Sequence, residues 1–145
     1  MKTAGDILIV DDESDIRLLI GATLRDEGFT TMEAASAMEA RDLLAAKPPG
    51  LAILDIWMRD SDMDGLELLE WVKSVYPEVP VLMISGHGTV ETAVQAIRNG
   101  AYDFIEKPFK EDRLLLMVQR AFEASRLERE NAELRARVSE ESDPS

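Results

Sequence analysis

The chain has 145 residues, a length that is typical of one domain with its own hydrophobic core. Acidic residues outnumber basic ones by 29 to 16, which gives a formal net charge of −13 at pH 7. Because nucleic-acid backbones attract Lys and Arg, this charge argues against direct nucleic-acid binding. The absence of cysteine excludes disulfides and thiolate metal sites and fits a cytoplasmic location. No apolar run approaches the roughly 20 residues of a membrane span.

Short apolar runs alternate with amphipathic stretches along most of the chain. The apolar runs predict strands at residues 6–10, 29–33, 51–55, 80–84 and 102–105. The amphipathic stretches predict helices at residues 13–27, 36–46, 64–75, 89–99 and 110–138. This alternation favours an α/β fold, in which right-handed crossovers build a parallel sheet that is covered on both faces.

Polar residues follow the apolar runs at four of the predicted strand ends. They are Asp11 and Asp12, Asp55, Ser85, and Lys107 with Pro108. Because the ligand-binding ends of parallel strands share one edge of a sheet, we expect these side chains to converge on one crevice. Three carboxylates, a hydroxyl and an ammonium predict a site for a divalent cation and a phosphoryl group. Taken singly, the two aspartates could instead cap the following helix, and Ser85 could belong to an ordinary loop.

In this order on five strand–helix units, the same residues resemble the receiver domain of two-component response regulators. The resemblance covers about residues 5–122. It implies a flavodoxin-like (βα)5 fold with a five-stranded parallel sheet in the order 2-1-3-4-5 and, here, an extended C-terminal helix. It also implies a regulatory phosphoacceptor rather than an enzyme with turnover, whose partner is a sensor histidine kinase and whose cofactor is Mg²⁺.

The resemblance assigns roles to the residues at the strand ends. Asp55 matches the phosphoacceptor, and Lys107 matches the lysine that binds a phosphoryl oxygen, with a cis peptide bond between Lys107 and Pro108. The implied Mg²⁺ ligands are the carboxylates of Asp11, Asp12 and Asp55 and the backbone carbonyl of Trp57.

A conformational switch is also implied by the resemblance. The Ser85 hydroxyl moves toward the phosphoryl group, and an aromatic residue of the fifth strand, matched here to Tyr102, follows it. The face formed by residues 89–122 then changes. The alternative for Tyr102 is an ordinary, half-buried strand residue.

The loop after Asp55 departs from the usual receiver pattern, Asp-x-x-Met-Pro-x-x-Asp-Gly. Arg59 stands in the place of the proline, and the pair Asp64-Gly65 arrives two residues late. Together with residues 83–88 and 100–109, this longer loop resembles the nitrogen-regulation NtrC/NtrX group, the NtrX type in particular. Members of that group carry a central ATPase domain and a C-terminal DNA-binding domain, neither of which is expected in this chain. We therefore expect a receiver that controls the output of a transcription regulator.

The last predicted helix runs past the end of the receiver at residue 122. Residues 123–138 are predicted to form a helical extension, and residues 139–145 a disordered tail. A short heptad seam runs along this helix: Met117, Ala124, Leu127, Asn131, Leu134 and Val138. An Asn at a core position favours a parallel two-stranded coiled coil, so we expect a homodimer. A single solvated helix is the alternative.

Three other functions compete with a phosphorylation-dependent receiver. A pseudo-receiver that acts as a constitutive dimerisation module stays open because of the altered loop at residues 57–64. A phosphohydrolase of the aspartyl-phosphate kind needs a second Asp at the position held by Trp57. A nucleotide-binding flavodoxin-like protein needs a Gly-rich phosphate loop, and none follows any predicted strand.

Overall fold

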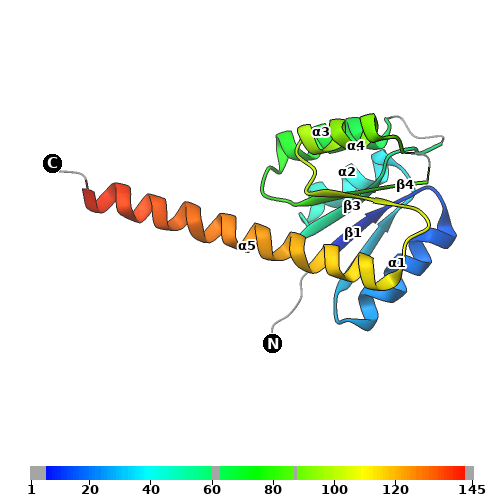
Figure 1. The fold of residues 1–145 in the computed structure, drawn as a ribbon, viewed down its shortest axis with the longest axis horizontal. Coiled ribbons are helices and arrows are strands. Elements are labelled where there is room, and N and C mark those ends of the chain that lie inside the picture. Colours follow the sequence, from blue (N-terminus) through cyan, green and yellow to red (C-terminus); the bar gives the residue numbers. More distant parts are fainter. Residues whose placement is uncertain (1–5, 60–62, 87, 143–145) are drawn as a thin grey trace.

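The computed structural model describes residues 6–59, 63–86 and 88–142, with side chains up to residue 137. Figure 1 shows a central sheet with helices on both faces and one long helix that leaves the sheet. The strands are β1 (Asp6–Val10), β2 (Thr30–Ala34), β3 (Leu51–Asp55), β4 (Val81–Ser85) and β5 (Asp103–Glu106). The helices are α1 (Ser14–Asp26), α2 (Ala37–Ala46), α3 (Gly65–Val75), α4 (Val90–Arg98) and α5 (Glu111–Ser142).

All five strands are parallel, and their order is β2-β1-β3-β4-β5, which confirms the predicted flavodoxin-like topology. Val10 pairs with Leu54, and Ser85 pairs with Glu106. The carboxyl ends of β1, β3, β4 and β5 therefore lie level with one another. The sheet thus brings the polar residues that follow these strands to a single edge.

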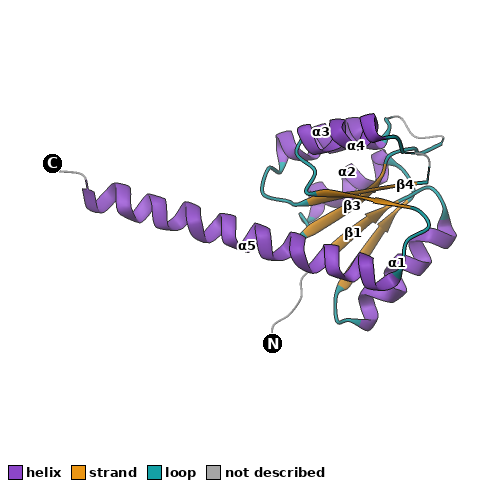
Figure 2. Ribbon diagram, in the orientation of Figure 1, coloured by secondary structure: helices purple, strands orange, loops and turns teal. Residues whose placement is uncertain are grey.

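The hydrophobic core has two layers, one on each face of the sheet. Helices α2, α3 and α4 cover one face, and α1 and α5 cover the other (Figure 2). In the central strands, successive residues face opposite layers, which explains why β1, β3 and β4 are apolar without alternation. The outer strand β2 is partly exposed, as its polar sequence predicts.

Local sequence signals fix where the helices begin. Asp64 and Glu67 form a capping box at the start of α3, in which each side chain accepts a hydrogen bond from the other residue's backbone N–H. Thr89 caps α4, and Ser36 caps α2. The capping box matters most for the site, because α3 begins directly after the loop that follows Asp55.

Helix α5 has 32 residues, which correspond to about 48 Å, and it projects well beyond the sheet (Figure 1). Its first part is anchored in the core by Leu114, Val118 and Ala121. At the edge of the sheet, Phe122 stacks on Phe29 with ring centroids 5.6 Å apart. The helix ends four residues later than predicted, because the polar residues 139–142 continue a helix that is already solvated. Residues 143–145 of the predicted tail lie outside the described residues.

Candidate functional site

Three aspartates meet at the carboxyl edge of the sheet. Asp11 and Asp12 follow β1, and Asp55 is the last residue of β3. One carboxylate oxygen from each lies within 4.8 Å of the others. Asp11 is fully buried and Asp55 is 3% exposed, whereas Asp12 is half-buried. The sheet therefore brings together the three acidic residues that the sequence singles out.

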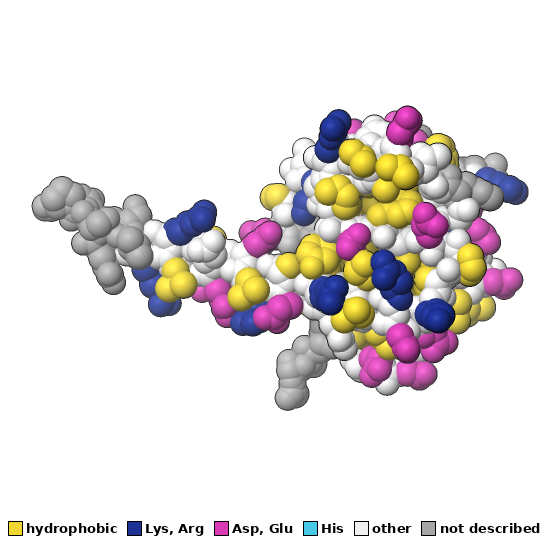
Figure 3. All heavy atoms as spheres, in the orientation of Figure 1, with side chains coloured by type: hydrophobic (Ala, Val, Ile, Leu, Met, Phe, Trp, Pro, Cys, Tyr) yellow, Lys and Arg dark blue, Asp and Glu magenta, His cyan; other side chains and the backbone are white. Residues whose placement is uncertain are grey.

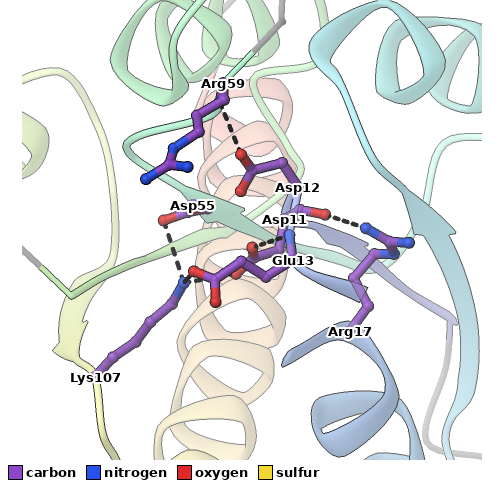
Figure 4. Close-up of polar contacts among 7 residues, drawn as sticks. All are labelled: Asp11, Asp12, Glu13, Arg17, Asp55, Arg59 and Lys107. Atoms are coloured by element: carbon purple, nitrogen blue, oxygen red, sulfur yellow. Dashed lines mark hydrogen bonds and ion pairs between the residues drawn. The ribbon is translucent and has the colours of Figure 1, made fainter. Parts of the chain in front are cut away.

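Lys107 lies among these carboxylates (Figure 4). Its Nζ is 2.8 Å from Asp11 Oδ2, 3.6 Å from Asp55 Oδ1 and 3.5 Å from Glu13 Oε1. The lysine follows β5, and its backbone N–H donates to the Ser85 carbonyl at 2.8 Å. The peptide bond from Lys107 to Pro108 is cis. One ammonium thus faces three carboxylates, which leaves the cluster with excess negative charge.

The protonation of the cluster reflects this excess. Burial and the neighbouring Asp11 carboxylate raise the pKa of Asp55 from 3.8 to about 7, against the opposing effect of Lys107. Burial alone would lower the pKa of Lys107. The hydrogen bond to Asp11 and the charge of Asp55 outweigh burial, so the pKa of Lys107 is raised.

Backbone and side-chain donors hold the aspartates in place. The Glu13 N–H donates to Asp11 Oδ1 at 2.8 Å, and the Arg59 N–H donates to Asp12 Oδ2 at 2.8 Å. The Arg17 guanidinium donates to the Asp11 carbonyl (Figure 4). The residue at the N-cap of α1 is Glu13, and its side chain makes no capping bond. The alternative in which Asp11 or Asp12 caps this helix is therefore not what the structure shows.

Gly65 lets helix α3 approach the backbone at Asp55. A Cβ at this position would lie 2.0 Å from the Asp55 carbonyl oxygen and 2.6 Å from Ile56 Cα. The Gly65 N–H donates to the Ile56 carbonyl at 2.8 Å. The backbone after the acidic residue is thus pressed against the first turn of α3, a contact that no other residue type allows.

The donor set fits a hard divalent cation. Carboxylate oxygens are the ligands that Mg²⁺ prefers, and three of them lie close together here. Asp11 Oδ2 is buried, and its partner in the described part of the chain is the Lys107 ammonium at 2.8 Å. The cluster therefore has both the oxygen ligands and the uncompensated charge that a cation requires.

Comparison with known proteins decides the family. A model of the response regulator receiver domain matches residues 7–119. The chain belongs to the response regulator receiver domain family. No helix in the described residues of this receiver is long and apolar enough to span a membrane.

Relatives of this receiver carry names from the NtrX group. The nitrogen assimilation regulatory protein NtrX of Azorhizobium caulinodans is 56% identical over 132 residues, which cover 91% of this chain and 29% of that protein. A putative NtrX-like response regulator of Rickettsia bellii is 55% identical over 133 residues, which cover 92% of this chain and 28% of that protein. The chain thus spans less than a third of the length of these relatives.

Two solved receiver structures are also similar to this chain. The receiver domain of NtrX from Brucella abortus is 57% identical, with a TM-score of 0.79, and the match covers 81% of this chain and 98% of that one. The beryllofluoride-activated NtrC4 receiver domain dimer is 39% identical, with a TM-score of 0.78 and coverage of 83% and 98%.

The structure places Tyr102 away from Ser85, whose hydroxyl the resemblance expects it to follow. Ser85 is buried at the site end of β4 and pairs with Glu106. The Tyr102 N–H donates to the carbonyl of Val81, which is the first residue of β4. Four residues of strand, roughly 13 Å, separate these two ends, so Tyr102 lies too far away to follow the Ser85 hydroxyl.

Phe104 is the aromatic residue of β5 that lies nearer the site. It pairs with Met83, two residues before Ser85. A Cβ at Gly88, in the loop after β4, would lie 2.4 Å from the Phe104 ring. The sequence does contain a signal for this placement: β5 ends at Glu106, so position 104 is closer to the site than position 102.

The predicted dimer seam divides into buried and exposed parts. Met117 is 6% exposed and packs in the core of the receiver, and Ala124 is half-buried. Leu127 and Leu134 are 51% and 56% exposed. Asn131 is exposed as well, and the side chain of Val138 lies outside the described part of the chain. The surface available to a second chain therefore begins after Met117.

Proposed function

We propose that this chain is a phosphorylation-dependent receiver in which Asp55 accepts a phosphoryl group from a sensor histidine kinase. The observation that carries the proposal is the position of Asp55, which is buried within ion-pair distance of Lys107 and beside two further carboxylates. The relatives named as NtrX support control of a transcription regulator as the output. Because this chain spans 29% of that relative, the output is proposed for a longer protein that includes this receiver.

In the proposed reaction, an Asp55 oxygen attacks the phosphorus of phosphohistidine. An O–P bond forms, the N–P bond breaks, and the imidazole nitrogen keeps the electron pair and takes up a proton. Lys107 Nζ, 3.6 Å from Asp55 Oδ1, binds an oxygen of the transferred group. Ser85, at the end of β4, provides a hydroxyl for another phosphoryl oxygen.

Asp11, Asp12 and Asp55 would hold Mg²⁺ through their carboxylates, with the Trp57 carbonyl as a further ligand. When bound, the ion supplies positive charge that offsets the carboxylates and the phosphoryl oxygens. This charge also favours ionised Asp55, whose pKa is about 7 without a cation. The three aspartates therefore serve both to bind the ion and to place the nucleophile.

Incubation with acetyl phosphate tests the proposed reaction without the kinase. We expect the intact mass to increase by one phosphoryl group when Mg²⁺ is present, and to stay unchanged with EDTA. Replacing Lys107 by Gln is expected to slow the reaction by at least tenfold, because a charged hydrogen bond contributes about 1.5–3 kcal/mol. Equal labelling with and without Mg²⁺ would contradict the proposed metal dependence.

Phosphorylation is proposed to change the face formed by α4, β5 and the start of α5. Val90, Val94 and Ile97 of α4 are 81%, 43% and 46% exposed. Figure 3 shows hydrophobic side chains gathered over this helix. Phe104 lies beneath α4 and against the loop after Ser85, so a movement of that loop can reach the exposed face.

Replacing Phe104 by Ala is expected to leave phosphorylation of Asp55 intact and to weaken its effect on assembly. The matched control is Tyr102→Ala, which alters an aromatic residue just before the start of β5. Light scattering with and without Mg²⁺ and beryllofluoride measures assembly for both variants. A loss of coupling in Tyr102→Ala, with Phe104→Ala unaffected, would identify Tyr102 and not Phe104 as the switch residue.

The seam on α5 is proposed to support a homodimer, and the solved NtrC4 relative is described as a beryllofluoride-activated dimer. Leu127 and Leu134 are half-exposed apolar residues in a part of α5 that is rich in Glu and Arg. Replacing both by Gln is expected to shift the solution mass toward the monomer. If the parent chain has the dimer mass with and without beryllofluoride, the alternative of a constitutive dimerisation module gains support instead.

A further inference from the structure

Arg59 lies beside the acceptor site, in the position where the usual receiver loop has a proline. Its backbone N–H donates to Asp12 Oδ2 at 2.8 Å, a bond that a proline cannot make. This bond joins the loop after β3 to the end of β1. It therefore fixes the start of the Arg59 side chain over the acidic cluster.

The side chain of Arg59 runs back toward Asp55. Figure 4 shows the guanidinium on the same side of the cluster as the Asp55 carboxylate and the Lys107 ammonium. The residue is exposed, and no carboxylate among the described residues forms an ion pair with its guanidinium. The group is thus a cation at the mouth of the site whose donors are not used by the described part of the chain.

A phosphoryl group on Asp55 would add oxygens and negative charge to a cluster that already holds Asp11, Asp12 and Glu13. Lys107 is held among the carboxylates and reaches the group from within the site. A guanidinium presents a planar fork of N–H donors that matches phosphoryl oxygens, and it stays charged at any physiological pH. Arg59 is exposed, and its guanidinium lies across the Asp55 carboxylate from the Lys107 ammonium (Figure 4).

We propose that Arg59 is a second phosphoryl-binding residue, whose guanidinium closes over the group on Asp55 and binds one of its outer oxygens. The inference rests on the proposed phosphoacceptor function of Asp55. It assigns two separate roles to the residue: the backbone N–H orients Asp12, and the side chain contacts the phosphoryl group.

Two titrations, one with beryllofluoride and one with Mg²⁺, separate the role of the Arg59 side chain from that of its backbone N–H. Beryllofluoride mimics the phosphoryl group on Asp55, so Arg59→Gln is expected to weaken its binding about tenfold at saturating Mg²⁺. The same substitution removes a positive charge near three carboxylates. Binding of Mg²⁺ alone is therefore expected to stay equal or to become tighter. A variant that merely folds poorly would bind both more weakly.

Two further variants control for the loss of charge and for the loss of the backbone N–H. Arg120→Gln, which changes the same charge on an exposed face of α5, is expected to bind both probes like the parent chain. Arg59→Pro removes the guanidinium and the N–H together, so it is expected to weaken Mg²⁺ binding as well. The fluorescence of Trp57, two residues after Asp55, provides the signal for both titrations.

Unchanged beryllofluoride binding in Arg59→Gln would overturn the inference while leaving the function of Asp55 intact. Weaker Mg²⁺ binding in Arg59→Gln would also overturn it, because the side chain would then act through Asp12. A parent chain that binds no beryllofluoride at all would overturn the proposed function and the inference with it.

Discussion

Replacing Asp55 by Asn is expected to abolish phosphoryl acceptance and yet to make the protein more stable in metal-free buffer at pH 8. The carboxylate is 3% exposed and lies beside Asp11, which raises its pKa to about 7. An ionised Asp55 therefore destabilises the folded state by on the order of 4 kcal/mol, since the pKa is raised by about three units and each unit corresponds to about 1.4 kcal/mol. The neutral amide of Asn removes this cost.

The destabilisation of the folded state by ionised Asp55 depends on pH. The folded state binds the Asp55 proton more tightly than the unfolded state, where the pKa is near 3.8. The contribution of protonated Asp55 to the free energy of unfolding is thus fully present below about pH 4. It is lost as the pH rises to 7 and stays lost above 7. The difference between Asp55→Asn and the parent should grow across the same range.

Urea unfolding with EDTA between pH 4 and pH 8 measures this difference. Asp42→Asn, at an exposed position of α2, is the matched control and should show no such trend. Added Mg²⁺ should stabilise the parent more than Asp55→Asn, because the variant lacks one of the three carboxylates. Equal stability of the two proteins at pH 8 without metal would contradict the account of the acidic cluster.

Replacing Gly65 by Ala is expected to lower the free energy of unfolding by about 2–4 kcal/mol and to impair phosphorylation. The added methyl group would lie 2.0 Å from the Asp55 carbonyl oxygen, and the neighbouring atoms are backbone. Either α3 or the backbone after β3 must therefore move. Movement of the backbone displaces Asp55 itself, and movement of α3 loosens the packing that holds the Asp55 backbone in place.

Gly86→Ala is the matched control for stability. A Cβ at Gly86 would meet only the Lys107 side chain, at 3.7 Å and beyond. This is an ordinary van der Waals distance, so the change in unfolding free energy should stay within about 1 kcal/mol. Chemical denaturation of both variants gives the comparison. Equal stabilities would show that the contact between α3 and Asp55 is more yielding than its geometry indicates.

The strand order and the meeting of Asp11, Asp12, Asp55 and Lys107 could be predicted from the sequence. Apolar runs mark the buried strands, and a parallel sheet brings their ends to one edge. Patterns of apolar and polar residues along the sequence therefore predict most of the fold. The predicted elements differ from the observed ones by only a residue or so, apart from the end of α5.

Features that depend on register or on close packing could not be predicted in the same way. Tyr102 precedes β5 and Phe104 lies within it, and the register with β4 decides which of them is near Ser85. Met117 matches a heptad, but packing of α5 against the sheet buries it. The contact of Gly65 with Asp55 depends on the path of the loop between β3 and α3, which the sequence does not specify.

Locating the phosphoryl group on the chain shows directly which carboxylate is the acceptor. The chain is incubated with acetyl phosphate and Mg²⁺, treated with borohydride, which reduces an aspartyl phosphate to homoserine, and mapped by peptide mass spectrometry. We expect homoserine at position 55 and unmodified Asp11 and Asp12. Homoserine at position 11 or 12, or a phosphorylated chain without any homoserine, would show that Asp55 is not the acceptor.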